Sequence, residues 1–399
     1  MSRTVACITA TIGLGVGAAA SPGLTVDEEG VLLRDGAPYR GFGVNYFDAF
    51  MRVILDPDDN AYEEGFAVLA EHGIPFARVN FGGFWPVQWE LYLEDRDAYF
   101  ARMDAFVASA EAHGLGLIPS LFWYHGCVPD IVGEPVSAWG DKDSKTHAFM
   151  KEYVEAVVTR YRDARAIWAW EFGNEYNLAA DLPNAEEHRP MTAPRLGTPE
   201  SRGPEDDLTH AMVITAAKAF AEAVRRHDPH RVITTGHSIP RPSAEHMRRG
   251  EGWSQDSEAE YRKNLVDITP DPHNLASIRL YPDHIEDRFG RETLTYGELL
   301  AISLDAAANA GKALFVGEFG APSPPSADAG KVRENHAAMI QAMMNSGVPL
   351  AAAWVFDLPQ QEDEGWNFTP QNERAYILEK LQAANERLAA EGRSARPPS

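Results

Sequence analysis

Eight short apolar segments alternate with longer amphipathic segments along the chain, and this alternation restricts the fold more than any other feature. The apolar segments are Gly41–Asn45, Pro75–Asn80, Gly116–Phe122, Ala166–Phe172, Arg231–Thr235, Ser277–Tyr281, Ala313–Glu318 and Leu350–Phe356. The segments between them include the helical patterns Ala61–His72, Tyr99–His113, Lys145–Tyr161 and Leu208–His227. Repeated strand–helix units form parallel sheets. Eight units favour an α/β fold of the (β/α)8 TIM-barrel type. A dinucleotide-binding sheet is disfavoured, because the first strand is not followed by a glycine-rich phosphate-binding motif.

The segment before the first predicted barrel strand has the pattern of a β-hairpin. Residues 24–40 contain two short strand-like pieces around Asp35-Gly36, a dipeptide that favours a tight hairpin turn. We expect this hairpin to close the bottom of the barrel. Residues 21–391 are then predicted to form a single domain that includes the hairpin, and residues 392–399 a disordered tail.

The first residues have the pattern of an export signal. Arg3 precedes the apolar stretch Val5–Ala20, and the alanines at its end fit a small-residue cleavage site before Ser21. At 16 residues the stretch is short for a membrane helix, which needs about 20. We therefore predict a signal peptide at 1–20 and a secreted or periplasmic protein, with a disordered or misassigned start as the alternative.

Charge and cysteine content limit the partners and the means of stabilisation. The formal net charge of −23 argues against nucleic acids and anionic membranes, because both are bound by basic surfaces. Once residues 1–20 are removed, Cys127 is the one remaining cysteine, so no internal disulfide can form. Stability must come from the core, and we expect a monomer.

Two of the apolar segments end in a glutamate. Glu175 closes AIWAWEFGNE and Glu318 lies in ALFVGEFG, on the predicted fourth and seventh strands. Buried carboxylates are costly unless they have partners, so two at strand ends indicate a cleft for acid–base chemistry. Cleavage of a glycosidic bond uses such a pair. Glu171 faces the same way as Glu175 but lies about 13 Å deeper, and we expect a structural carboxylate with a basic partner there.

The surrounding residues resemble a known family. Gly173-Asn174-Glu175 and Gly317-Glu318-Phe319-Gly320 are similar to the active-site motifs of clan A retaining glycoside hydrolases, most closely glycoside hydrolase family 5. The resemblance follows the strand order over nearly the whole chain. It implies that Glu175 is the general acid/base and Glu318 the nucleophile. Glu175 must then stay protonated near neutral pH, and a poorly solvated pocket beside Glu318 should raise its pKa. Neither a cofactor nor a metal is required.

The resemblance also implies roles in substrate binding or support for residues near other strand ends, namely Arg78, Asn174, Tyr281, Trp354, His125 and His237. Arg78 and Tyr281 would hold the nucleophile, Asn174 would contact the sugar 2-hydroxyl, and Trp354 would form the floor under the sugar. Structural alternatives stand beside these roles. Arg78 could be an ion-pair partner inside the barrel, and Tyr281 could serve in packing.

The chain departs from the family pattern on the sixth strand. Family members commonly have His-X-Tyr there, whereas this chain has Arg279-Leu280-Tyr281. Arginine is always charged and bulkier than imidazole. If Arg279 faces the site, it would favour an ionised nucleophile or recognise a charged or unusual sugar. The departure leaves the substrate more open than the mechanism.

The sequence therefore predicts a secreted, retaining β-glycoside hydrolase that acts on β-linked hexose polysaccharides or oligosaccharides. The first expectation is an endo-β-1,4-mannanase or a cellulase-like enzyme. An exo-acting β-mannosidase or β-glucosidase is an alternative, because the long loops at 177–206 and 238–254 could close one end of the cleft. A non-catalytic carbohydrate-binding barrel is the alternative from another class. A metal-dependent hydrolase is disfavoured, because the first strand ends without a His-X-His pair.

Overall fold

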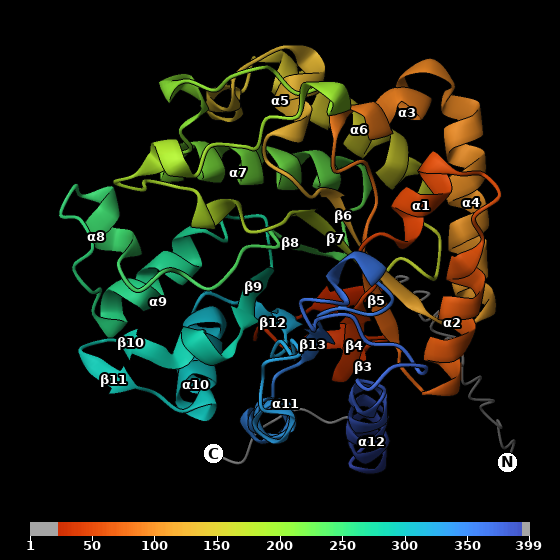
Figure 1. Ribbon diagram of the computed structural model, residues 1–399, viewed down its shortest axis with the longest axis vertical. Coiled ribbons are helices and arrows are strands. Elements are labelled where there is room, and N and C mark those ends of the chain that lie inside the picture. Colours follow the sequence, from red (N-terminus) through yellow and green to blue (C-terminus); the bar gives the residue numbers. More distant parts are fainter. Residues whose placement is uncertain (1–22, 393–399) are drawn as a thin grey trace, which may run out of the picture.

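The computed structural model describes residues 23–392, and its centre is a closed barrel of eight parallel strands (Figure 1). Around the barrel the strand order is β12-β13-β4-β5-β6-β7-β8-β9. The strands are β4 (Gly41–Asn45), β5 (Phe76–Asn80), β6 (Gly116–Phe122), β7 (Ala169–Gly173), β8 (Val232–Thr234), β9 (Leu275–Leu280), β12 (Ala313–Phe319) and β13 (Leu350–Ala353). Each overlaps one of the eight predicted segments, which confirms the (β/α)8 barrel.

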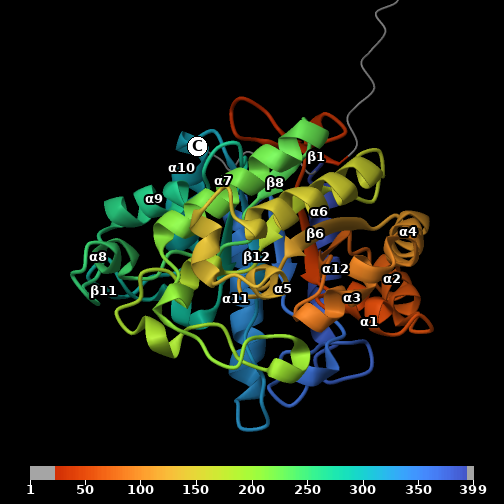
Figure 2. The ribbon, with the colours of Figure 1, turned by 90° about the horizontal axis from the view of Figure 1, so that it is seen from above.

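Helices surround the strands in both views of the molecule (Figures 1 and 2). They are α1 (Ala49–Leu55), α2 (Ala61–Glu71), α3 (Glu90–Glu94), α4 (Arg96–Ala112), α5 (Cys127–Val132), α6 (Lys145–Tyr161), α7 (His210–His227), α8 (Ala244–Arg248), α9 (Glu258–Asp267), α10 (Tyr296–Asn309), α11 (Ala329–Ser346) and α12 (Tyr376–Ala390). Helix α7 illustrates why these segments are helical. The Thr209 side chain caps its first turn by accepting from the Met212 N–H, and its buried residues recur at three- to four-residue spacing.

The N-terminal segment forms a small antiparallel sheet at the bottom of the barrel. Strands β1 (Leu24–Val26), β2 (Leu32–Arg34) and β3 (Ala37–Pro38) pair in that order. The turn at Asp35 and Gly36 has positive φ angles of 53° and 78°, as a tight hairpin turn requires. Leu24 and Leu32 join an apolar cluster with residues that begin the barrel strands, including Phe76. The predicted hairpin around Asp35-Gly36 is formed by β2 and β3, and β1 adds a third strand.

Long connections follow several strands at the opposite end of the barrel, where the strands have their C-terminal ends. Residues 177–206 follow β7 and contain only short 3-10 turns, while α8 lies in the loop after β8. A further hairpin, β10 (Glu286–Arg288) with β11 (Arg291–Thr293), follows β9 and was not predicted. The predicted signal segment 1–20 and the tail beyond Gly392 lie outside the described residues. Within residues 23–392, no helix has both the length and the apolar character needed to cross a membrane.

Candidate active site

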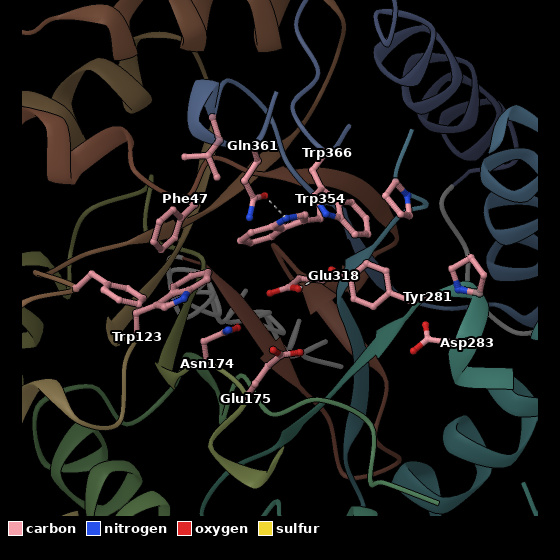
Figure 3. Close-up of a pocket in the computed structure, with 14 residues that line it drawn as sticks. Phe47, Trp123, Asn174, Glu175, Tyr281, Asp283, Glu318, Trp354, Gln361 and Trp366 are labelled. Carbon is pink, nitrogen blue, oxygen red and sulfur yellow. Dashed lines mark hydrogen bonds between the residues drawn. The ribbon is translucent and has the colours of Figure 1, made fainter. Parts of the chain in front are cut away.

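The two glutamates at the strand ends line one cavity at the C-terminal end of the barrel (Figure 3). Its volume is about 550 Å³, within the range of small-molecule sites. Both carboxylates point into the same space in Figure 3. The lining residues are Phe47, Phe84, Trp123, Asn174, Glu175, Tyr281, Pro282, Asp283, Glu318, Pro322, Trp354, Leu358, Gln361 and Trp366.

Local backbone irregularities place the two carboxylates. The pairing of β12 with β9 shifts register between Val316 and Glu318, and after the shift Glu318 pairs with Arg279. Such irregularities turn a side chain toward a new direction. Glu175 has a positive φ of 55°, which is uncommon outside glycine. The bond from its N–H to the Gly236 carbonyl, 3.0 Å long, helps to hold this conformation.

Arg78, on β5, is fully buried and donates hydrogen bonds both to Glu171, deeper in the barrel, and to Glu318, at the cavity. Its Nε donates to Glu171 Oε1 at 2.7 Å. Its Nη1 donates to Glu318 Oε1 and to Asn45 Oδ1, both at 2.9 Å, and its Nη2 donates to Asn174 Oδ1 at 2.8 Å. Glu171 is thus a buried carboxylate with a basic partner, as predicted. The same arginine orients Glu318 at the cavity.

Arg279, on β9, lies between the two cavity carboxylates. Its Nε is 3.2 Å from Glu318 Oε1 and 3.8 Å from Glu175 Oε1. These two oxygens can therefore be no more than 7.0 Å apart, the sum of the two separations. Glycosidases place their two carboxyl groups about 5–9.5 Å apart across the scissile bond, so these two are close enough to act on one glycosidic bond.

The third partner of Glu318 is Tyr281, which follows β9. Its hydroxyl donates to Glu318 Oε2 at 2.7 Å. Burial, followed by the charge of Glu318, raises the pKa of Tyr281 well above its usual value, so the phenol keeps its proton. With Arg78 and Arg279 at Oε1, both oxygens of Glu318 face donors. The carboxylate is held in one orientation at the cavity wall.

Glu175 has a different environment. Burial raises its pKa to about 7, the negative charge of Glu318 acts in the same direction, and Arg279 opposes both. The side chain is still 29% exposed, so a ligand in the cavity can reach it. A carboxyl group with a pKa near neutral can deliver a proton at physiological pH and take one back afterwards. The direction agrees with the expectation from the sequence.

Aromatic rings form the walls around the carboxylates. Trp354 follows β13, and its Nε1 donates to Gln361 Oε1 at 2.9 Å (Figure 3). Its ring centroid is 6.1 Å from those of Phe47 and Trp123. Sugar rings have apolar faces that pack on such surfaces. Trp354 therefore lies in the aromatic wall of the cavity, and its role as a floor for the sugar stays a prediction.

The two predicted histidines are placed differently from the rest. His237 is fully buried, its Nδ1 lies 3.0 Å from the Ile268 carbonyl, and it is absent from the lining of the cavity. Burial lowers its pKa to about 3, as expected for a neutral ring inside the wall. His125 lines an adjoining cavity of about 310 Å³, which shares Asn174 and Glu175 with the first. Burial lowers the pKa of His125 to about 4.

The sequence did not point to several residues that line the cavity. Phe47 lies two positions after β4 and Phe84 four after β5, and their places near strand ends were the available signal. Asp283, three positions after β9, had the same signal, whereas Gln361, eight positions after β13, had none. Gln361 is fixed by its bond to Trp354, a contact that depends on the path of the loop.

One group of side chains has the spacing of a metal site. Ligand atoms of His246, Asp256 and Glu260 lie within 4.8 Å of one another. The Asp256 carboxylate already accepts from the Glu245 and His246 N–H groups at the start of α8. Glu260 likewise accepts from the N–H and hydroxyl of Ser257. These oxygens are used in helix capping, and the group carries no argument for a metal.

A closed β/α barrel with two close carboxylates in an aromatic cleft has the fold and site of the retaining glycoside hydrolases. The family model for cellulase (glycosyl hydrolase family 5) matches residues 35–357, and the chain belongs to this family.

Individual relatives agree with the family. A mannan endo-1,4-beta-mannosidase F from Aspergillus clavatus is 28% identical over 182 residues, which cover 44% of this chain and 33% of that protein. The chain thus matches about a third of the length of this relative. An endo-1,4-beta-mannanase from Rhizomucor miehei has a TM-score of 0.65 at 16% identity, covering 92% of this chain and 99% of that one. A glycoside hydrolase family 5 mannosidase from the same organism has a TM-score of 0.66 at 13% identity, covering 94% and 100%. The two structures support the fold alone.

Proposed function

We propose that this protein is an endo-acting β-1,4-mannan hydrolase that works by double displacement, with Glu318 as nucleophile and Glu175 as acid and base. One observation carries the proposal. Arg279 Nε lies within 4 Å of both carboxylates in a single cavity, so one glycosidic bond can contact both. The mannan substrate rests on the relatives, several of which are named mannan endo-1,4-beta-mannosidases.

In the first step, Glu318 attacks the anomeric carbon while Glu175 protonates the glycosidic oxygen. The bond between that carbon and oxygen breaks, an ester forms with Glu318, and the leaving saccharide departs with the proton from Glu175. Arg78 and Tyr281 orient the attacking carboxylate. The pKa of about 7 lets Glu175 hold this proton at neutral pH.

In the second step, Glu175 takes a proton from water, and the water oxygen attacks the anomeric carbon. The ester bond to Glu318 breaks, and the sugar is released with its original configuration. Asn174 takes part through its amide. Its Oδ1 accepts from Arg78 and Arg279, which leaves the Nδ2 group to donate to the sugar 2-hydroxyl.

The endo mode is supported by the shape of the cleft. The adjoining cavity shares Phe84, Trp123, Asn174 and Glu175 with the catalytic one. Saccharide units on that side of the scissile bond therefore have space near the acid. An exo-acting β-mannosidase remains the competing function, and the products distinguish the two.

The test is hydrolysis of β-1,4-mannan, a soluble cellulose derivative and an aryl β-mannoside, with product sizing and NMR of the first anomer formed. We expect a ladder of manno-oligosaccharides and the β-anomer first. Mannose as the sole early product would indicate exo action, and preference for the cellulose derivative would indicate a cellulase. Initial release of the α-anomer would contradict the double displacement. Hydrolysis of none of the three by a folded sample would favour a non-catalytic carbohydrate-binding barrel.

We also propose that residues 1–20 direct export and that 21–391 act as one catalytic domain whose partner is the saccharide. The apolar stretch before Ser21 and the barrel architecture support this proposal. Expression in a secreting host followed by N-terminal sequencing should give a mature chain that begins at Ser21. An unprocessed intracellular protein would contradict it.

A further inference from the structure

Arg279 departs from the family pattern, and one of its five N–H groups has no acceptor in residues 23–392. Its side chain is fully buried and absent from the lining of the catalytic cavity. Gly317, on β12, leaves room for it, because a Cβ at that glycine would collide with the Nη1 of Arg279. The structure thus gives no support to direct recognition of a charged sugar by Arg279. Its effect on the reaction has to pass through the residues that line the cavity.

Four of the N–H groups hold the guanidinium in place. Nη1 donates to Ser277 Oγ at 2.9 Å and to the Ile278 carbonyl at 3.4 Å. Nη2 donates to Asn174 Oδ1 at 2.8 Å and to the Gly236 carbonyl at 2.7 Å. Because the guanidinium group is planar, these bonds also fix the direction in which the fifth N–H group, on Nε, points.

The fifth N–H group lies beside both cavity carboxylates and is bonded to neither. Nε is 3.2 Å from Glu318 Oε1 and 3.8 Å from Glu175 Oε1, without the alignment of a hydrogen bond. Arg78 donates to Glu318 but forms no ion pair with Glu175. Within residues 23–392, Arg279 is therefore the one cation that forms ion pairs with both carboxylates. Since buried N–H groups normally have an acceptor, this one is suited to a partner that changes during the reaction.

The proposed reaction moves one negative charge between these carboxylates. In the first step Glu318 loses its charge to the ester bond, while Glu175 gives its proton to the glycosidic oxygen and becomes a carboxylate. The second step reverses both changes, because Glu175 takes a proton from water and the ester bond to Glu318 breaks. A cation beside both groups favours the charged form of each in turn. Arginine supplies this charge at every pH, whereas the histidine common in the family is largely neutral at pH 7.

We propose that Arg279 is a positioning residue that serves the two carboxylates in turn: its Nε–H faces Glu318 before the first step and donates to Glu175 in the ester intermediate. This inference rests on the proposed function, since it assigns a residue to the same two steps. Arg279 already opposes the rise in the pKa of Glu175. The proposed steps leave the charge of its other titratable or charged neighbours unchanged. These neighbours are Arg78, Glu171, Tyr281, His237, His284 and Asp283.

The test compares Arg279→Gln, which removes the charge, with Arg279→Lys, which keeps it. The substrate is the aryl β-glycoside that the wild-type protein hydrolyses best, with a leaving group good enough for the second step to limit kcat. In Arg279→Gln the fall in kcat/KM on the alkaline side should move up by about one pH unit or more, because the cation that lowers the pKa of Glu175 is gone. At pH 7, kcat should fall roughly tenfold, because Glu175 is then less ionised in the ester intermediate. Arg279→Lys should keep the wild-type midpoint.

The matched control is Arg291→Gln, the same substitution at a half-exposed arginine of β11, which should leave the midpoint in place. An unmoved midpoint in folded Arg279→Gln overturns the inference, and so does an equal shift in Arg279→Lys. If Arg279→Gln fails to fold, a crystal structure of the wild-type protein trapped as a 2-fluoroglycosyl ester decides. Arg279 Nε should then lie within about 3.2 Å of a Glu175 oxygen, and a separation still near 3.8 Å would overturn the inference. Absence of wild-type turnover on every β-glycoside overturns the proposed function, and this inference with it.

Discussion

The two ends of the barrel interior are built from the same strands but differ in chemistry. At the N-terminal end, Phe76, Trp168 and Phe315 lie in an apolar cluster closed by the N-terminal sheet. On β5, Arg78 lies two residues beyond Phe76 and so points to the same side, but it belongs to the charged end. Apolar burial stabilises the first end, whereas buried charges at the second are tolerated only because they are paired. We therefore expect substitutions at the apolar end to change stability and substitutions at the charged end to change catalysis.

The largest effect is expected from Glu318→Ala at the charged end. Loss of the nucleophile should lower kcat by roughly 10⁴-fold or more on every substrate. The barrel should still fold, because the apolar end is untouched. Steady-state kinetics and a thermal melt check both points. The control is Glu364→Ala, an exposed acid after β13, which should keep full activity. Residual turnover within a hundredfold of wild type would remove Glu318 from the mechanism.

Glu175→Ala sharpens the difference between the two carboxylates. We expect kcat on mannan to fall roughly 10²- to 10⁴-fold, as for loss of a general acid. An aryl mannoside with a very good leaving group needs little protonation, so its first step should be much less affected. Pre-steady-state measurement of the released aryl group tests this. Equal losses for both substrates would rule out the acid role.

Trp168→Ala tests the apolar end. Trp168 is 2% exposed and packs against Tyr39 and Phe76. Its truncation should lower the free energy of unfolding by about 3–5 kcal/mol, with kcat/KM of the folded protein unchanged. Trp253→Ala is the matched control, since Trp253 is 57% exposed and should cost less than about 0.5 kcal/mol. Urea denaturation provides the measurement. A loss of kcat/KM in Trp168→Ala would show that the two ends are coupled.

Tyr281→Phe removes the hydroxyl that donates to Glu318 and keeps the aromatic ring. We expect roughly a tenfold fall in kcat, since a hydrogen bond to a charged group is worth about 1.5 kcal/mol or more. The measurement is kcat on the aryl mannoside at a fixed pH. An unchanged kcat would mean that the arginines alone orient the nucleophile.

The pH dependence tests the electrostatic part of the comparison. Because the pKa of Glu175 is about 7, kcat/KM should fall as pH rises through 7 and the acid form is lost. The same sign applies to stability. Because the pKa of Glu175 in the folded state is raised from 4.5, protonated Glu175 contributes to the free energy of unfolding. This contribution is fully present below pH 4.5 and is lost as pH rises through 7. The pH dependence of kcat/KM measures the first effect, and thermal melts at a series of pH values measure the second. A fall in kcat/KM with a midpoint near pH 5 would contradict the assignment.

Much of this arrangement could be predicted from the sequence. The eight strands were visible because parallel strands buried on both sides are continuous apolar runs. Glu175 and Glu318 stood out because each interrupts such a run at its polar end. Arg279 was noted as a departure from the family, and the structure places it between the two carboxylates.

Two features escaped prediction for different reasons. The strands of the local β10–β11 hairpin are short and polar, so they lack the apolar alternation that indicates a strand. The position of Gln361 depends on a contact formed by the path of its loop, for which a local pattern carries no signal. The family resemblance implied that His237, which follows a strand end, would contact the substrate. Its ring instead turns into the wall toward the end of α9, where the Ile268 carbonyl is its partner.

Covalent trapping with a 2-deoxy-2-fluoro-β-mannosyl fluoride tests the central claim most directly. The fluorine slows hydrolysis of the ester more than its formation when the leaving group is good, so the intermediate of a double displacement accumulates. We expect one added sugar per protein molecule, located by peptide mass spectrometry on Glu318 and absent from Glu318→Gln. A sugar attached to any other residue, or active enzyme that shows no adduct and releases the inverted anomer, would contradict the account.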